Sequence, residues 1–224
     1  RDVIVVGAGI VGCAVACELA RRGVSVEIID ERPIAMGATQ ASAGVLAPYI
    51  EAREGSRLLE LTTRSLELYD EFVARITAES GVPVMYRRTG TIDVAANDSE
   101  LQVLRARAEM LGRRGVPGLI LDALTVRSEE PHLGDGALGG LLIDIHGFVA
   151  AAELTRALAT AARRYGAQLI EPSRVQVQRR RLEAADVGPE RHLFRPLVYL
   201  RCTSIICDNT CVVKGGDAMN GVDV

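Results

Sequence analysis

Tryptophan is absent from this sequence of 224 residues, and aromatic residues make up only 4% of it. The sequence has no run of about 18 apolar residues, so it predicts no helix that crosses a membrane. It also lacks an excess of basic residues. The formal net charge is −3, which gives no electrostatic reason to expect a nucleic acid as a partner. With 48% hydrophobic residues, the composition is that of an ordinary globular protein with a substantial core.

The sequence also lacks the usual cysteine and histidine patterns of metal sites. No C-x-x-C pair occurs, the cysteines follow no zinc-site spacing, and the three histidines are scattered, so no metal site is predicted. The number of cysteines is odd and shows no disulfide framework, which indicates a reducing, cytoplasmic setting. The cysteines are Cys13, Cys17, Cys202, Cys207 and Cys211.

The start of the chain follows a strand–helix–strand pattern. Residues 3–6 form a β-branched run that ends at a glycine, which is typical of a strand buried on both faces. Residues 10–22 have apolar side chains at helical spacing and stop at Gly23, and residues 24–30 again favour a strand. This βαβ unit predicts an α/β fold with a parallel sheet and a right-handed crossover.

The middle of the chain alternates between helices and short strands. Residues 56–79 predict a long helix, residues 97–98 can cap another, and residues 138–145 favour a strand. Residues 151–165 then predict a helix and residues 168–170 a buried strand, so the α/β pattern returns. This order indicates a nucleotide-binding domain that is interrupted by an inserted α+β region.

We therefore expect a discontinuous, Rossmann-like dinucleotide-binding domain formed by residues 1–50 and 140–180. Residues 51–139 would form part of an inserted α+β substrate domain. After about Arg179 neither helix caps nor the α/β alternation recur. Residues 181–224 are therefore expected to form an atypical, irregular tail.

A glycine-rich segment follows the first predicted strand and opens the first predicted helix, and it fits the pattern G-x-G-x-x-G. Gly7 allows a tight turn, Gly9 lets the backbone approach a pyrophosphate, and Gly12 lets helix and strand pack closely. Backbone N–H groups at the start of the helix would face the anion. The predicted contacts in this segment are Gly7, Ala8, Gly9, Ile10, Val11 and Gly12.

Two further features favour a dinucleotide. Asp30 ends the second predicted strand, where a carboxylate accepts hydrogen bonds from ribose hydroxyls and repels the 2′-phosphate of NADP. Residues 37–48 are mostly small, so their backbone can lie along an extended cofactor, with the hydroxyls of Thr39 and Ser42 available to it. A tightly packed loop without a ligand is the alternative for this segment. The fingerprint itself is shared by FAD and NAD proteins.

Taken together, the fingerprint, Asp30 and the segment 37–48 resemble the FAD-dependent D-amino-acid oxidase superfamily. The likeness is greatest to its branch of glycine oxidases of thiamine biosynthesis, which has a similar Ser-Ala-Gly-hydrophobic-Leu-Ala-Pro stretch. Residues 86–92, 130–133 and 147–149 match the order of the family's later segments. The resemblance extends over residues 2–178.

The resemblance implies FAD as the cofactor and carries specific residues with it. It implies that Gly44 and Val45, with Ala43 beside them, lie near the isoalloxazine ring. Val175 would belong to a strand whose backbone reaches the adenine. The FAD contacts implied in the rest of the chain are Gly7, Ala8, Gly9, Ile10, Val11, Gly12, Asp30, Glu31, Thr39 and Ser42.

The resemblance also implies a reaction, the oxidation of a small amine or amino acid. A hydride would pass from the α-carbon to the flavin, the imine would hydrolyse, and O₂ would reoxidise the flavin to give H₂O₂. No catalytic side chain is assigned. Arg195 and Tyr199 have suitable residue types for a substrate site but match no motif, and the family's later substrate and FAD segments have no counterpart after Arg179.

Three alternatives to an active oxidase therefore stay open. The chain could be a flavin dehydrogenase that uses another acceptor, a non-catalytic FAD-binding chain that needs a partner to complete its site, or an NAD-binding protein. The quaternary state is also open, with a homo-oligomer among the alternatives.

Overall fold

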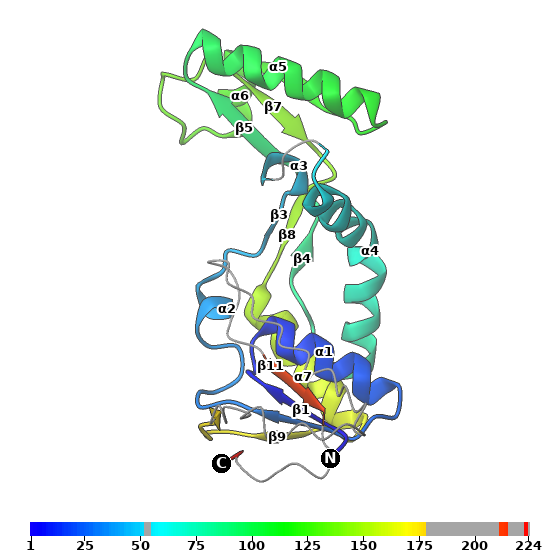
Figure 1. Cartoon of the computed structure of the whole chain (residues 1–224). Coiled ribbons are helices and arrows are strands. Elements are labelled where there is room, and N and C mark those ends of the chain that lie inside the picture. The colour runs from blue at the N-terminus through cyan, green and yellow to red at the C-terminus, as the bar shows by residue number, and fades with distance from the viewer. Residues whose placement is uncertain (52–54, 178–210, 215–221, 224) are drawn as a thin grey trace, which may run out of the picture. The chain divides into compact units, whose positions relative to one another are not determined.

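The computed structural model describes residues 1–51, 55–177, 211–214 and 222–223, and these divide between two compact units (Figure 1). The first unit comprises Arg1–Ser42, Val73–Val84 and Ala150–Val224, and the second comprises Ala43–Phe72 and Met85–Val149. Among the described residues, no helix is both long and apolar enough to cross a bilayer.

The first unit is built on a mixed four-stranded sheet with the order β11-β1-β2-β9. Strands β1, β2 and β9 are parallel, as the βαβ pattern predicts, whereas β11 pairs with β1 in the antiparallel direction. The predicted α/β fold is thereby confirmed, and β11 adds a strand in a region where the sequence showed no pattern. The bounds are β1 Val3–Val6, β2 Val26–Ile29, β9 Gln168–Ile170 and β11 Cys211–Lys214.

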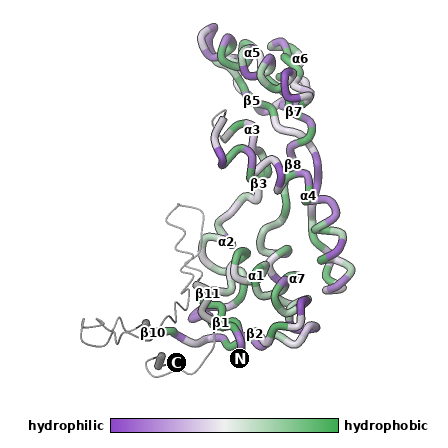
Figure 2. The backbone as a smooth tube through the Cα atoms, turned by 45° about the vertical axis from the view of Figure 1, so that its right-hand side comes forward, coloured by the Kyte–Doolittle hydropathy of each residue, from purple (hydrophilic) through white to green (hydrophobic). Residues whose placement is uncertain are grey.

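Two helices of the first unit pack closely on each other, α1 (Ile10–Arg21) and α7 (Ala151–Arg164). Both carry hydrophobic stretches along their length (Figure 2). Their buried side chains are mostly alanine and cysteine, and small side chains let helix axes approach closely. Cys13, Ala16, Ala157 and Ala161 are each fully buried, which explains the small-residue pattern of α1.

The second unit contains two three-stranded antiparallel sheets, with the orders β3-β8-β4 and β5-β7-β6. Helix α5 (Asp98–Arg113) packs on the second sheet and begins at Asn97, whose side chain accepts a hydrogen bond from the Glu100 N–H at 3.0 Å. The sequence offers Asn97 or Asp98 as the cap, and the structure has Asn97. The strands are β3 Val45–Leu46, β4 Tyr86–Arg87, β5 Thr91–Ala95, β6 Leu119–Asp122, β7 Gly139–Ile143 and β8 Gly147–Val149.

The remaining elements are one long helix and several short helices and strands. Helix α4 (Arg57–Ser80) is the longest, and Leu59, Leu66, Val73 and Ile76 form its buried stripe. The others are α2 Ala38–Ala41, α3 Pro48–Glu51, α6 Ala123–Glu129, β10 Gln176–Val177 and β12 Val222–Asp223.

The boundaries between the units differ from the expected domain limits. Residues 43–50 and 140–149 belong to the second unit because β3 and β8 pair with each other there, and residues 73–84 belong to the first unit. Pairing between distant segments decides such boundaries, and local sequence patterns do not reveal it. The roles of the two units as cofactor and substrate domains stay predictions.

Candidate functional site

The glycine-rich segment forms a tight turn between β1 and α1. Gly7 has a φ of +108°, in the range that favours glycine, and its N–H donates to the Ile29 carbonyl at 2.8 Å. The next N–H, of Ala8, donates to Asp30 Oδ2 at 2.6 Å. The turn is therefore fastened to the end of β2 by one backbone and one side-chain acceptor.

The start of α1 carries no negative side chain of its own. Gly9 is the N-cap and has no side chain to cap the helix, and no acidic residue lies in the first turn. The Ile10 N–H donates to Thr39 Oγ1 at 3.1 Å, which connects α2 to the start of α1. The partial positive charge of the helix start is thus left for an external anion such as a diphosphate.

The carboxylate of Asp30 is held in one orientation by two backbone donors. Oδ2 accepts from Ala8, and Oδ1 accepts from the Arg32 N–H at 2.8 Å. Hydrogen bonds to both oxygens fix the direction of a carboxylate. The charge is therefore preorganised beside the glycine turn.

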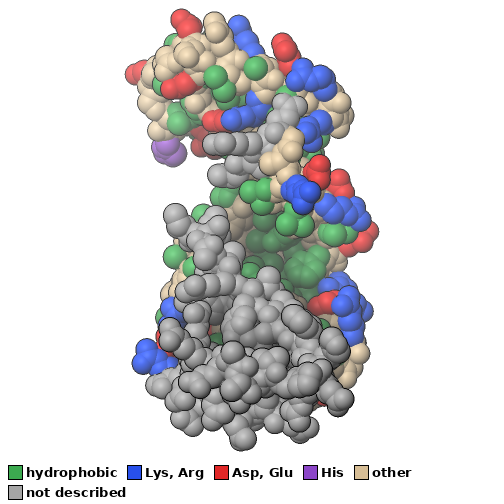
Figure 3. Space-filling view, viewed as in Figure 1, with side chains coloured by type: hydrophobic (Ala, Val, Ile, Leu, Met, Phe, Trp, Pro, Cys, Tyr) green, Lys and Arg blue, Asp and Glu red, His purple; other side chains and the backbone are tan. Residues whose placement is uncertain are grey.

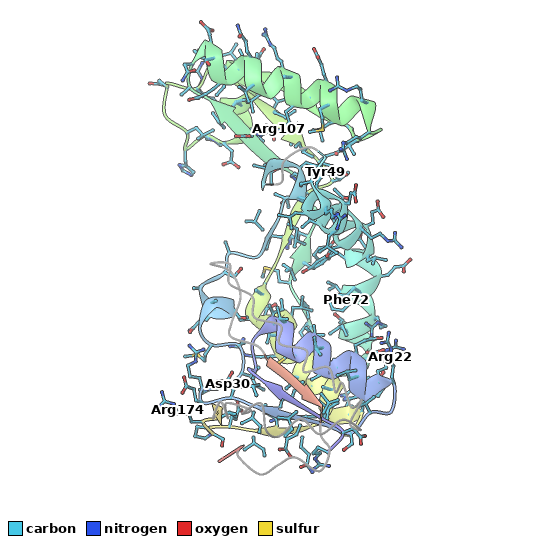
Figure 4. All side chains as sticks on the ribbon, viewed as in Figure 1. Arg22, Asp30, Tyr49, Phe72, Arg107 and Arg174 are labelled. Atoms are coloured by element: carbon cyan, nitrogen blue, oxygen red, sulfur yellow. The ribbon has the colours of Figure 1, made fainter. Side chains whose placement is uncertain are left out.

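A cavity of about 310 Å³ opens at this carboxylate. It lies wholly in the first unit, and Figure 4 shows Asp30 and Arg174, two of its lining residues, near each other. The side of the cavity at β1 and β2 consists of Val6, Gly7, Ile29, Asp30, Glu31 and Arg32. The loop after β9 contributes the rest of the lining, Ser173, Arg174 and Val175.

Several sequence-predicted residues are thus brought together in the first unit. Gly7, Asp30, Glu31 and Val175 line one cavity, and Thr39 contacts the helix that begins beside it. Gly12 is buried in α1, whereas Val11 and Ser42 are exposed. Whether these residues contact a cofactor stays a prediction.

Ala43, Gly44 and Val45 belong to the second unit. Gly44 has a φ of +70°, and a Cβ atom there would lie 1.8 Å from the Val149 carbonyl oxygen. Its position immediately before β3 therefore requires glycine for the close approach to Val149 of β8, independently of any ligand. Val45 is 61% exposed. The predicted proximity of these residues to an isoalloxazine ring stays a prediction.

Sequence reasoning missed Arg32, Ser173 and Arg174 as lining residues of the cavity. Their position next to predicted residues was a usable signal, since Arg174 precedes Val175 and Arg32 follows Glu31. Arg195 and Tyr199 lie outside the described residues, as do Cys202 and Cys207.

Arg88, Asp70 and Tyr86 form a polar cluster in the second unit. Arg88 donates to Asp70 Oδ2 at 2.6 Å and to the carbonyls of Leu66 and Ile145, and Tyr86 donates to Asp70 Oδ1 at 2.9 Å. The hydrogen bond from Arg88 lowers the pKa of Asp70, and burial together with the bond to Asp70 raises the pKa of Tyr86 to about 12. Charges of both signs are interspersed over the visible surface of this unit (Figure 3).

His146 is the most unusual polar residue of the second unit. It is fully buried, its Nδ1 lies 2.7 Å from Thr91 Oγ1, and its ring stacks on Tyr49 at 5.7 Å between centroids. Its Nε2 has no hydrogen-bond partner. Burial, with a smaller effect of the Arg88 charge, lowers its pKa to about 4, so the imidazole is neutral at pH 7.

The described cysteine side chains and acidic groups offer no second reactive centre. Burial raises the pKa of Cys13 to about 12 and that of Cys17 to about 11, so both are unreactive thiols near neutral pH. Among the residues that the structure describes, no group of three or more His, Cys, Asp or Glu could hold a metal ion.

Known proteins resemble this chain in sequence and in fold. A family model described as FAD dependent oxidoreductase matches residues 2–200. Glycine oxidase of Geobacillus kaustophilus is 31% identical over 175 residues, which cover 78% of this chain and 46% of that protein. Glycerol 3-phosphate dehydrogenase of Caloramator mitchellensis is 29% identical over 160 residues, covering 70% and 32% respectively.

A solved structure shows the same likeness. The crystal structure of glycine oxidase from Bacillus cereus ATCC 14579 superposes with a TM-score of 0.70 at 30% identity, and the match covers 81% of this chain and 48% of that one. The chain therefore spans less than half the length of each of these three relatives.

Proposed function

Because this chain belongs to the family of FAD-dependent oxidoreductases, we propose that it takes part in oxidising the C–N bond of a small amine or amino acid. The resemblance to the D-amino-acid oxidase superfamily and its glycine oxidase branch is confirmed by the family match and by the two glycine oxidases. The substrate, the electron acceptor and the residues that hold the cofactor are part of the proposal.

The observation that supports the proposal best is the arrangement at the start of α1. Gly7 of the glycine turn and the oriented carboxylate of Asp30 line one cavity of about 310 Å³, and α1, which begins at Ile10, has no acidic side chain in its first turn. These groups suit the adenosine diphosphate part of FAD, the cofactor of this family. In the proposed complex the N–H groups of Val11 and Gly12 hold the diphosphate, and Asp30 accepts hydrogen bonds from ribose hydroxyls.

FAD, when bound, supplies the two-electron acceptor for the oxidation. The amine would leave as an imine, which water hydrolyses to a keto acid or glyoxylate and ammonia, and O₂ would take up the electrons as H₂O₂. The substrate amine has to be neutral to lose a hydride, so the rate should rise with pH as the amine deprotonates. The contribution proposed for this chain is orientation of the cofactor, because no described side chain is placed as an acid or base.

A dehydrogenase is the second candidate, since a glycerol 3-phosphate dehydrogenase is among the relatives. In that case the electrons would pass to a quinone or a protein acceptor instead of O₂, and the substrate could be an alcohol. The third candidate function is that of a non-catalytic FAD-binding chain, which requires a second chain for turnover.

The test is to purify the protein, record its visible flavin spectrum, and add glycine, sarcosine or D-proline without oxygen. We expect bleaching of bound flavin, and formation of H₂O₂ when air is admitted. Bleaching by substrate with dye reduction but no H₂O₂ would support the dehydrogenase. Bound flavin that no amine or glycerol 3-phosphate bleaches would contradict turnover by this chain, and failure to bind FAD would contradict the proposal as a whole.

A further inference from the structure

The chain segments that follow β2 and β9 stay joined after the two strands end. The Asp30 N–H donates to the Ile170 carbonyl at 3.2 Å, and the Ser173 N–H donates to the Asp30 carbonyl at 2.8 Å. Because β2 and β9 are parallel neighbours, both segments leave the sheet at the same edge. Backbone pairing therefore continues into the loops that line the cavity.

Two side-chain contacts connect the same loops. Glu171 Oε2 accepts from the Ile34 N–H at 2.9 Å, and Arg174 Nε donates to Glu31 Oε2 at 3.0 Å. The second contact joins two residues that line the cavity, because Glu31 follows β2 and Arg174 lies in the loop after β9. The two loops are thus cross-linked by side chains, and one of the cross-links joins two lining residues of the cavity.

The two adjacent carboxylates at the end of β2, Asp30 and Glu31, differ in burial and in their bonding partners. Asp30 is half-buried and its oxygens are oriented by the N–H groups of Ala8 and Arg32. Glu31 is exposed, and its Oε2 forms an ion pair with the Arg174 guanidinium from the loop after β9. A carboxylate neutralised by an arginine attracts hydroxyl donors less strongly than one fixed by neutral N–H groups.

We infer that Glu31 and Arg174 are positioning residues, which hold the two walls of the cavity at the spacing that the adenosine end of the cofactor requires. Asp30 is then the carboxylate that meets the ribose, and Glu31 acts through Arg174. This inference rests on the proposed function, since it assumes that the cavity binds the adenosine end of FAD. When the loops after β2 and β9 are already fixed in the free protein, less conformational entropy is lost on binding the cofactor.

The effect is expected to be modest because the pair is exposed, with side-chain exposures of 75% for Arg174 and 51% for Glu31. Exposed ion pairs are screened by water and contribute little, and the corresponding change in affinity is about threefold. A double-mutant cycle can still test the inference, because it compares the affinity changes of the single variants with that of the double variant.

The experiment measures the dissociation constants of FAD and of ADP for the purified apoprotein. The variants are Glu31→Gln, Arg174→Gln, the double variant, and the exchange Glu31→Arg with Arg174→Glu. We expect each single variant to weaken both ligands about threefold, the double variant to be no weaker than the singles, and the exchange to restore affinity to within about twofold. The thermal midpoint of the apoprotein should stay the same in all four.

A direct contact between Glu31 and the ribose gives a different pattern. Glu31→Gln would then weaken ADP and FAD, Arg174→Gln would leave them unchanged, and the exchange would not restore affinity, which would overturn the inference. The exposed pair Arg64 and Glu67 of the second unit is the matched control, and exchanging its charges should leave both constants unchanged. Failure of the unaltered protein to bind FAD would instead contradict the proposed function.

Discussion

Two polar clusters, one in each unit, differ in the partners to which their side chains bond. In the first unit, Asp30 and Thr39 accept hydrogen bonds from backbone N–H groups of the glycine turn and of α1. In the second unit, Arg88 and Asp70 bond to each other and His146 bonds to Thr91. The first arrangement orients backbone groups around a cavity, as a binding site requires, whereas the second joins strands and a helix to each other. Polar residues alone therefore do not identify a site, and their partners have to be known.

The comparison predicts that changes in the second unit affect folding more than cofactor binding. Gly44→Ala should have the largest effect, because the new Cβ would lie 1.8 Å from the Val149 carbonyl oxygen and φ is +70°. We expect the free energy of unfolding to fall by about 3 kcal/mol or more, measured by urea denaturation.

Gly115→Ala is the matched control for this change. It has a φ of +71° but nothing within 4 Å of the new Cβ, so only backbone strain of about 1–2 kcal/mol is expected. Equal losses for the two variants would show that β3 and β8 can move apart without cost.

His146 should make the stability of the second unit depend on pH. Its pKa is about 4 when buried, against an ordinary value of 6.5, so the unfolded chain binds more protons between these values. The stability that it contributes is present above pH 6.5 and is lost as the pH falls toward 4, by up to about 3 kcal/mol. Denaturation of the protein and of His146→Phe across this range measures the difference.

The phenylalanine variant keeps a ring to stack on Tyr49 but cannot be protonated, so its stability should change less over this pH range. His132→Phe, at an exposed position, is the control and should keep the slope of the unaltered protein. A slope that His146→Phe leaves unchanged would mean that other groups cause the acid sensitivity.

Replacement of Asp30 in the first unit should weaken the binding of FAD, whereas replacement of a comparable carboxylate in the second unit should not. Asp30→Ala removes the acceptor of two backbone N–H groups and the proposed ribose contact, so FAD should bind about tenfold to a hundredfold more weakly. Asp93→Ala in the second unit removes a carboxylate that is paired with Arg107, but it should leave FAD affinity unchanged. Titration of FAD into the three apoproteins tests this. Equal weakening by both variants would contradict the assignment of the cavity.

The smallest effects are expected for the replacement of two threonines, one in each unit. Thr39→Val removes the acceptor of the Ile10 N–H and should weaken FAD binding by about fivefold, which corresponds to about 1 kcal/mol. Thr91→Val removes the partner of His146 and should lower the free energy of unfolding by a similar amount without a change in FAD affinity. A loss of FAD affinity in Thr91→Val, with unchanged affinity in Thr39→Val, would contradict the comparison between the two units.

The sequence predicted the elements whose cause is local. The β-branched run before Gly7, the periodic apolar residues of α1 and α7, and the cap at Asn97 each depend on residues close in the chain, and the structure has all of them. The site prediction likewise brought together Gly7, Asp30, Glu31 and Val175, which line one cavity, although their contacts with a cofactor are untested.

What the sequence did not reveal depends on pairing between distant segments. Strand β11 forms through its register with β1, and Arg174 becomes a wall of the cavity because β9 is the neighbour of β2. The unpartnered Nε2 of His146 likewise follows from packing that no local pattern encodes. The family resemblance implies that Gly44 lies near the isoalloxazine ring, and its close approach to Val149 gives the glycine a structural reason as well.

The measurement that tests the account most directly is the competition of ADP with FAD for the purified apoprotein, with Asp30→Ala and Asp93→Ala beside it. The account predicts that ADP displaces FAD from the unaltered protein and from Asp93→Ala, and that Asp30→Ala loses affinity for both ligands. Binding of FAD that ADP cannot displace, or that Asp30→Ala leaves intact, would contradict the claim that the glycine turn and its carboxylate hold the adenosine diphosphate.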